Sequence, residues 1–143
     1  AASNWQIDRM ARIRRIIDRQ GDQIMERVMA EAIINGELSR HLKKSIRIYK
    51  QRRDHLVELL NKDLANHVEF DIPEGGMAVW LRFKNCQLTD LRDYFTSTGL
   101  SLDIDKYLAR QFNAFRFGFT SLEEEEQNKV VDLMTKAIEL SAS

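Results

Sequence analysis

Hydrophobic residues recur at helical spacing along the first sixty residues of the chain. From Trp5 to Ile17 they recur at roughly helical spacing with arginines between them, which predicts an amphipathic helix. Asp22 is suited to cap a second helix, and Asn35-Gly36 is suited to end it. Ser39 is then expected to cap a long helix that reaches about Leu60.

Beyond about residue 65, apolar and polar residues alternate, as they do in strands. This alternation predicts strands over residues 68–72 and 77–83, the second largely buried because both of its faces are apolar in part. A short helix from Thr89 to Gly99 and a third strand over residues 100–104 are expected to follow.

The last third of the chain predicts one more strand and a closing helix. Residues 105–112 are expected to form a loop or a helical turn, and residues 114–120 a fourth strand. Ser121 with Glu124 fits a capping box at the start of the last helix. The predicted fold class is α/β (α+β), with two long N-terminal helices followed by a small mixed sheet of about four strands and helices packed on one face.

Arg116 is a single cation inside the aromatic fourth strand. Phe115, Phe117 and Phe119 alternate with it, so we expect its guanidinium on the opposite face. A guanidinium next to a core needs a partner, usually a carboxylate that accepts two parallel hydrogen bonds. The strand alone favours an internal Asp or Glu as that partner, and a substrate carboxylate is the functional alternative.

The turn Pro73-Glu74-Gly75-Gly76-Met77 also has two interpretations. Gly-Gly between two strands is most often a plain hairpin turn. Because glycine has no Cβ, Gly75 and Gly76 would also allow a ligand to approach the backbone closely.

Composition, net charge and residue spacing argue against several classes of protein. The chain has 143 residues, 43% hydrophobic and 31% charged, with a formal net charge of +0, which argues against a dedicated nucleic-acid binder. The one cysteine, Cys86, rules out an internal disulfide and is expected to be structural. No apolar run or leader segment suggests a membrane or secretion, so a cytoplasmic location is the default. The three histidines lack metal-ligand spacing and are expected to be ordinary surface residues: His41, His55 and His67.

The long helix is strongly basic between residues 40 and 53. A solvated face balanced by nearby acids such as Asp54 and Glu58 is the expected explanation. The alternative is a stand-alone interaction module whose basic helices bind an acidic protein or nucleic acid. Salt-sensitive binding to a polyanion would distinguish the two.

Five stretches of the chain, in order, resemble the C-terminal small domain of fold-type-I pyridoxal-phosphate (PLP) aminotransferases. The resemblance covers nearly the whole chain and is closest to the aminotransferase-like domain of MocR/GntR-type bacterial regulators. The stretches are residues 16–22, Gly36 to Lys44, Tyr49 with Arg52-Arg53-Asp54, Pro73 to Trp80, and Phe115 to Phe119.

The resemblance implies that Arg116 binds the α-carboxylate of an amino-acid substrate, with Gly75 and Gly76 near the substrate. No stretch matches the family's Schiff-base lysine or its other cofactor-binding groups, so PLP is implied only for the full-length parent. We therefore expect a fragment of a larger protein, inactive alone: residues 1–35 would link to an absent large domain, and residues 36–143 would form the small domain. The segment from Ser101 to Phe112 departs from the family, where a Pro-Gly loop often stands.

The partners that the resemblance implies are amino-acid and keto-acid substrates, the large domain and a second copy of the chain in a homodimer. Nucleic acid would be bound only through an upstream domain, if the parent is a regulator. A regulator that senses amino acids through Arg116 without catalysis is a variant of the same hypothesis.

Overall fold

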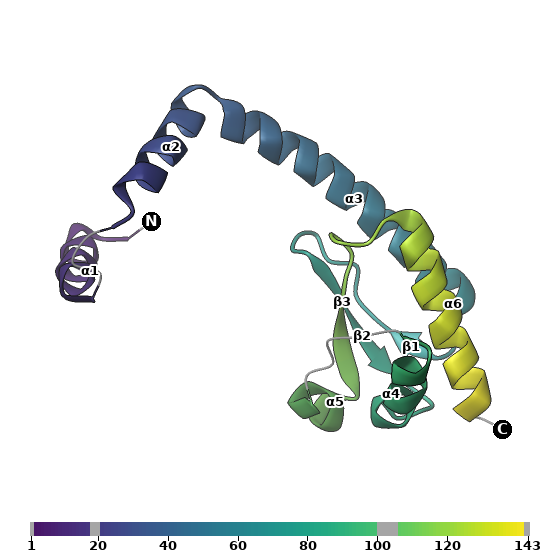
Figure 1. The fold of residues 1–143 in the computed structure, drawn as a ribbon. Coiled ribbons are helices and arrows are strands. Elements are labelled where there is room, and N and C mark those ends of the chain that lie inside the picture. Colours follow the sequence, from purple (N-terminus) through teal and green to yellow (C-terminus); the bar gives the residue numbers. More distant parts are fainter. Residues whose placement is uncertain (1, 18–20, 100–105, 142–143) are drawn as a thin grey trace. The chain divides into compact units, whose positions relative to one another are not determined.

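The computed structural model describes residues 2–17, 21–99 and 106–141 (Figure 1). The chain divides into two compact units, Ala1–Lys44 and Ser45–Ser143. The division falls inside one long helix. The expected role of residues 1–35 as a link to a large domain stays a prediction.

The first unit consists of α1 (Asn4–Ile17), α2 (Gln23–Ile34) and the beginning of α3 (Glu37–Asp63). Asp22 caps α2 as predicted, since its side chain accepts a hydrogen bond of 3.0 Å from the Met25 backbone N–H. Gly36 follows α2 with φ +71°, which a residue without a Cβ adopts easily. The predicted cap at Ser39 is wrong, because α3 begins at Glu37, directly after this glycine.

Neither α1 nor α2 has a buried residue. An ion pair between Arg14 and Glu26 connects the two helices. Their large apolar side chains are more than two fifths exposed at every position that the structure describes in α1 and α2, namely Trp5, Ile7, Met10, Ile13, Ile16, Ile17, Ile24, Met25, Val28, Met29, Ile33 and Ile34. The first unit thus folds as helices without forming a core of its own.

The described part of the second unit combines three strands with helices. In chain order, the rest of α3 is followed by β1 (Val68–Glu69), β2 (Ala78–Phe83), α4 (Leu88–Ser97), α5 (Lys106–Phe112), β3 (Ala114–Gly118) and α6 (Glu124–Ser141). Residues 106–112, expected to be a loop or a helical turn, therefore form a short helix.

The described strands form one antiparallel sheet in the order β1-β2-β3. The predicted fold class is confirmed, although the described part of the sheet has three strands and no parallel pair. The expected strand over residues 100–104 lies outside the described residues. β1 is shorter than the predicted strand over residues 68–72, since Ile72 is 58% exposed and only Val68 and Glu69 pair with β2.

The core lies on one face of this sheet. Val79 and Leu81 of β2 and Phe115 and Phe117 of β3 are at most 3% exposed on this face. Apolar side chains from three helices cover them: Leu56 and Leu60 from α3, Leu88, Leu91 and Phe95 from α4, and Val130, Val131, Met134, Ala137 and Ile138 from α6. The expectation that β2 has apolar side chains buried on both faces is wrong, because its burial follows strict alternation with Trp80 and Arg82 exposed.

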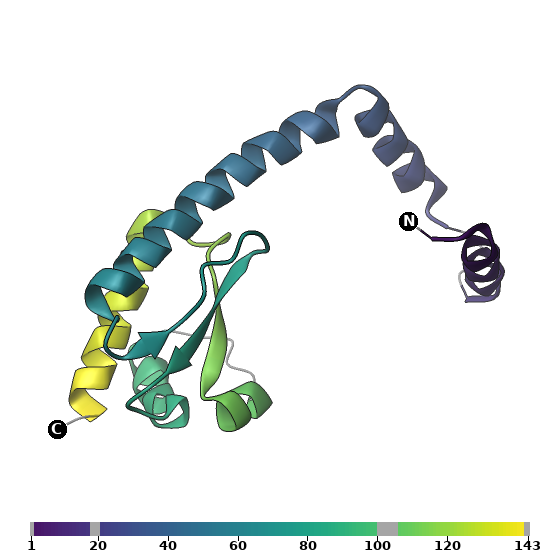
Figure 2. The same cartoon turned by 180° about the vertical axis from the view of Figure 1, so that it is seen from behind.

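Helices α3 and α6 lie side by side over this core (Figures 1 and 2). Arg52 donates hydrogen bonds to the Thr120 carbonyl and to Glu123, and His55 Nε2 lies 3.1 Å from the Asn128 amide oxygen. The capping box predicted for Ser121 with Glu124 is wrong, because Glu124 is the first residue of α6 and not its third. The carboxylate of Glu126 accepts a hydrogen bond of 2.8 Å from the Glu123 backbone N–H, so Glu123 precedes the first helical residue.

Candidate functional site

The exposed face of the sheet presents Arg116 to solvent. Within β3 burial alternates, with Phe115 and Phe117 buried and Arg116 exposed between them. In the antiparallel register Arg116 lies directly opposite Trp80 of β2. The two buried phenylalanines stack with ring centroids 6.0 Å apart, so the backbone on both sides of Arg116 is fixed by the core.

Arg116 has no internal partner in the part of the chain that the structure describes. Its guanidinium makes no hydrogen bond or ion pair there. The other arginines near the sheet are engaged: Arg82 with Glu69, and Arg52 with Glu123. The strand sequence alone favours an internal Asp or Glu, and the described residues provide none. The five N–H donors of this side chain therefore face outward, where a bound anion could accept them.

Asn113 positions the strand that carries Arg116, and the sequence interpretation missed it. Its amide Nδ2 donates to the carbonyls of Phe83 (3.0 Å) and Cys86 (2.8 Å), and its Oδ1 accepts 2.8 Å from the Leu88 N–H at the start of α4. Its φ is +51°, a backbone conformation that asparagine tolerates better than most residues. A polar residue just before an alternating strand is the signal that could have identified it.

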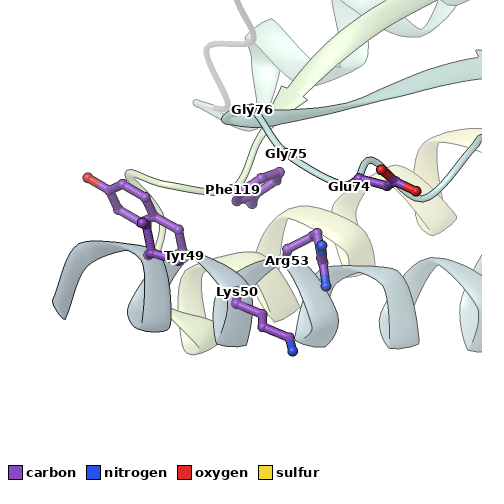
Figure 3. Close-up of a pocket in the computed structure, with 8 residues that line it drawn as sticks. Tyr49, Lys50, Arg53, Glu74, Gly75, Gly76 and Phe119 are labelled. Carbon is purple, nitrogen blue, oxygen red and sulfur yellow. The ribbon is translucent and has the colours of Figure 1, made fainter. Parts of the chain in front are cut away.

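Gly75 and Gly76 line a half-open pocket of about 210 Å³ beside α3. Figure 3 shows the ring of Phe119 between the glycine turn and this helix. The other lining residues come from α3 and the turn: Ile46, Tyr49, Lys50, Arg53 and Glu74. Gly76 has φ +90°, and no atom lies within 4 Å of the Cβ position of either glycine. The turn therefore leaves free space at its backbone.

Arg53 fixes this turn to α3. Its guanidinium donates to the Pro73 carbonyl at 3.0 Å and makes two hydrogen bonds, of 2.9 and 2.6 Å, to Asp54. Because the side chain is only 19% exposed and fully engaged, its role in the described structure is to hold the turn.

The pocket beside α3 includes two of the three predicted site residues, Gly75 and Gly76. Arg116 is absent from the residues that line the pocket at Gly75 and Gly76. Arg116 lies on the exposed face of the sheet, whereas Phe119, which lines the pocket, is 2% exposed and belongs to the core. Two separate surfaces of the second unit thus carry the candidate residues.

The lysines whose burial the structure describes lack the surroundings of a Schiff-base lysine. Every lysine side chain that the structure describes is exposed, including Lys50 at the pocket. The hydrogen bond from Lys136 to Asp132, at 2.6 Å, raises the pKa of Lys136. A lysine that forms a Schiff base needs the opposite, a desolvated site that lowers its pKa. None of the lysines whose burial the structure describes has the buried, desolvated surroundings that a Schiff-base lysine needs.

Cys86 and the histidines were the other residues considered for catalysis or metal binding. Burial, followed by the nearby Asp90 carboxylate, raises the pKa of the Cys86 thiol, which suits a structural cysteine better than a nucleophile. His55 and His67 are half-buried and not fully on the surface as expected. Within the described residues, no group of three or more His, Cys, Asp or Glu could hold a metal ion. The described helices also include none that is long and apolar enough to cross a membrane.

The chain is similar in sequence to a transcriptional regulator and similar in structure to aminotransferases. No family model matches the chain. It is 31% identical over 83 residues to the HTH-type transcriptional regulator NorG of Staphylococcus aureus (strain USA300), covering 58% of this chain and 19% of NorG. It superposes on the multiple substrate aminotransferase of Thermococcus profundus with a TM-score of 0.83 and 26% identity, over 96% of this chain and 35% of that enzyme.

A third comparison agrees in fold. The α-aminoadipate aminotransferase LysN of Thermus thermophilus, solved with N-(5'-phosphopyridoxyl)-L-leucine, matches all of this chain and 38% of its own length, with a TM-score of 0.82 and 17% identity. The chain thus spans well under half of each of these proteins. The resemblance stated from the sequence is confirmed: the chain has an aminotransferase-like fold, and its sequence relatives include HTH-type regulators.

Proposed function

We propose that this chain, which has an aminotransferase-like fold, is the small C-terminal domain of a PLP-dependent aminotransferase or of a MocR-like regulator with such a domain. In either parent, Arg116 binds the α-carboxylate of an amino acid. The fold comparisons and the regulator relatives support the domain assignment. PLP would be held by the rest of the parent protein, where it would supply the amino-group chemistry.

The observation that carries the proposal is the environment of Arg116. It is exposed, has no described partner, and stands on a strand whose other face is locked into the core. A guanidinium held this way can bind a carboxylate through two parallel hydrogen bonds, which fixes the orientation of the ligand as well as its position. An arginine on a mobile loop would lose more of its binding energy, because its backbone would also have to be ordered.

The alternative, a stand-alone module with a basic interaction helix, receives less support. Two of the cations that made α3 look basic, Arg52 and Arg53, bind groups inside the second unit. They are therefore unavailable to an acidic partner. The remaining cations of α3 are exposed, in agreement with the solvated face expected from the sequence.

The test is amino-acid binding by the full-length protein that contains this chain, measured by isothermal titration calorimetry with L-alanine and L-phenylalanine. Arg116→Ala removes two charge-assisted hydrogen bonds of about 1.5–3 kcal/mol each, so we expect affinity to fall at least about 100-fold. Arg116→Lys keeps the charge without the planar fork and should recover only part of the loss.

Arg92→Ala is the matched control, because it removes an exposed arginine from α4, a helix that contributes to the core side of the sheet. It should leave affinity unchanged. If Arg116→Ala binds amino acids as the unsubstituted protein does, Arg116 does not bind the carboxylate. The 143-residue chain alone is expected to show no exchange between amino and keto acids, and measurable transamination by it would contradict the fragment assignment.

A further inference from the structure

The strand register determines which side chains surround Arg116 on the exposed face. Trp80 is directly opposite it, and Ala78 and Arg82 are the next residues of β2 on the same face. Directly opposite residues of an antiparallel pair have Cβ atoms about 5 Å apart. A carboxylate bound by Arg116 therefore brings the rest of its molecule within reach of the Trp80 indole. Gly118 and Ala78, opposite each other at the next position, are small and leave room beside it.

The ring of Trp80 is accessible to solvent and packs against a second aromatic ring. It is 37% exposed, and its ring meets the ring of Phe112 at the end of α5 edge to face, with centroids 6.4 Å apart and an interplanar angle of 68°. Phe112 is itself 41% exposed. Two aromatic rings in this contact hold each other in place and together offer an apolar wall to a ligand.

A second carboxylate on the ligand would find no free cation in the described part of this face. Arg82, the next arginine, is paired with Glu69 at 2.9 Å. A hollow of about 350 Å³ on the β1 side of Trp80 is lined by Glu69, Asp71, Arg82 and Phe70. Its two carboxylates would repel a second negative charge of the ligand. The surroundings thus favour an apolar side chain over an acidic one.

We propose that Trp80, supported by Phe112, determines substrate specificity and selects an amino or keto acid with an aromatic or large apolar side chain. This proposal rests on the proposed function, in which Arg116 holds the α-carboxylate. Arg116 anchors the end that all amino acids share, and Trp80 contacts the part that distinguishes them.

Two unreactive acids distinguish the role of Arg116 from that of Trp80 in the full-length protein. One is 3-phenylpropionate, with one carboxylate and an aromatic ring, and the other is succinate, with two carboxylates. Binding is measured by isothermal titration calorimetry. We expect 3-phenylpropionate to bind more tightly than succinate. Trp80→Ala should weaken 3-phenylpropionate about tenfold, the value of one aromatic contact with its buried area, and change succinate less than about twofold.

Trp80→Phe keeps an aromatic ring and should retain most of the affinity for 3-phenylpropionate, so it supports the assignment even if Trp80→Ala folds poorly. Glu69→Gln frees Arg82 and should raise affinity for succinate several-fold, without improving 3-phenylpropionate. Equal losses for both acids in Trp80→Ala and Trp80→Phe, or no loss in either variant, would overturn the specificity role.

The same experiments distinguish a failure of the proposed function of Arg116 from a failure of the Trp80 role alone. If neither acid binds the unsubstituted protein, or if Arg116→Ala leaves both affinities unchanged, then Arg116 does not anchor a carboxylate and the proposed function fails. If Arg116→Ala abolishes binding of both acids while the Trp80 variants show no selectivity, the proposed function stands and only the role of Trp80 is rejected.

Discussion

The two faces of the three-stranded sheet place neighbouring residues of one strand in opposite environments. On one face Phe115 and Phe117 are each 3% exposed and lie under helices. On the other, Arg116 is exposed and Trp80 lies opposite it at 37% exposure. The difference arises from the two-residue period of a strand, which sends successive side chains to opposite sides.

Under the proposed function, this contrast separates the residues that stabilise the domain from those that bind the ligand. The core face gains its free energy from buried apolar area, and changes there are felt through the whole fold. The exposed face contributes little to that energy, so its residues are free to serve a ligand. Any change of register by one residue would exchange the two sets of side chains.

The sharpest test of this contrast is the pair Phe117→Ala and Arg116→Ala in the 143-residue chain. Removing the buried Phe117 ring should lower the free energy of unfolding by about 3–5 kcal/mol, through lost transfer energy and the cavity left behind. Removing the exposed Arg116 side chain should change it by less than about 0.5 kcal/mol. Urea denaturation followed by circular dichroism measures both. Similar losses for the two variants would mean that the faces do not differ in their contribution to stability.

A second test concerns Asn113, which holds the start of β3. Its three side-chain hydrogen bonds, at 2.8 to 3.0 Å, join β3 to the end of β2 and to the first turn of α4. Asn113→Ala removes them and also places alanine at φ +51°, so we expect a loss of about 2–3 kcal/mol in the same denaturation experiment.

Asn113→Gly separates the two causes, because glycine tolerates the positive φ but makes none of these hydrogen bonds. It should recover about 1 kcal/mol relative to Asn113→Ala and still be less stable than the unsubstituted chain. A glycine variant as stable as the original would show that backbone conformation, and not the hydrogen bonds, is what Asn113 supplies.

The sequence predicted features that depend on local periodicity. The alternation of Phe115, Arg116 and Phe117 was sufficient to place the cation opposite the core, because a period of two leaves only two faces. The Asp22 cap and the end of α2 at Gly36 also follow from local backbone chemistry.

Features that depend on distant contacts were not predictable in the same way. The expected burial of both faces of β2 failed at Trp80, since the sequence cannot show which face helices will cover. The capping box predicted at Ser121 failed because several adjacent acids suit the same helix end, and Glu126 is the one that accepts from the Glu123 N–H. Asn113 was missed because its partners lie 25 to 30 residues away.

The smallest expected effect concerns the glycine turn at the edge of the core face. Gly76 has φ +90° and Gly75 has a φ outside the left-handed region, while both have open space at the Cβ position. Gly76→Ala should therefore cost about 1–2 kcal/mol from backbone strain alone. Gly75→Ala should be neutral or stabilise by up to about 1 kcal/mol, because alanine restricts the unfolded chain.

The two glycine variants also distinguish the two interpretations of the turn. If Gly75 and Gly76 serve only the turn, Gly75→Ala leaves amino-acid binding by the full-length protein unchanged. If a ligand approaches this backbone, the added methyl group occupies space that the ligand needs, and Gly75→Ala weakens binding although the fold is as stable as before. Because binding then weakens while stability does not fall, the Gly75→Ala variant can show whether recognition extends from the exposed face of the sheet to the edge of its core.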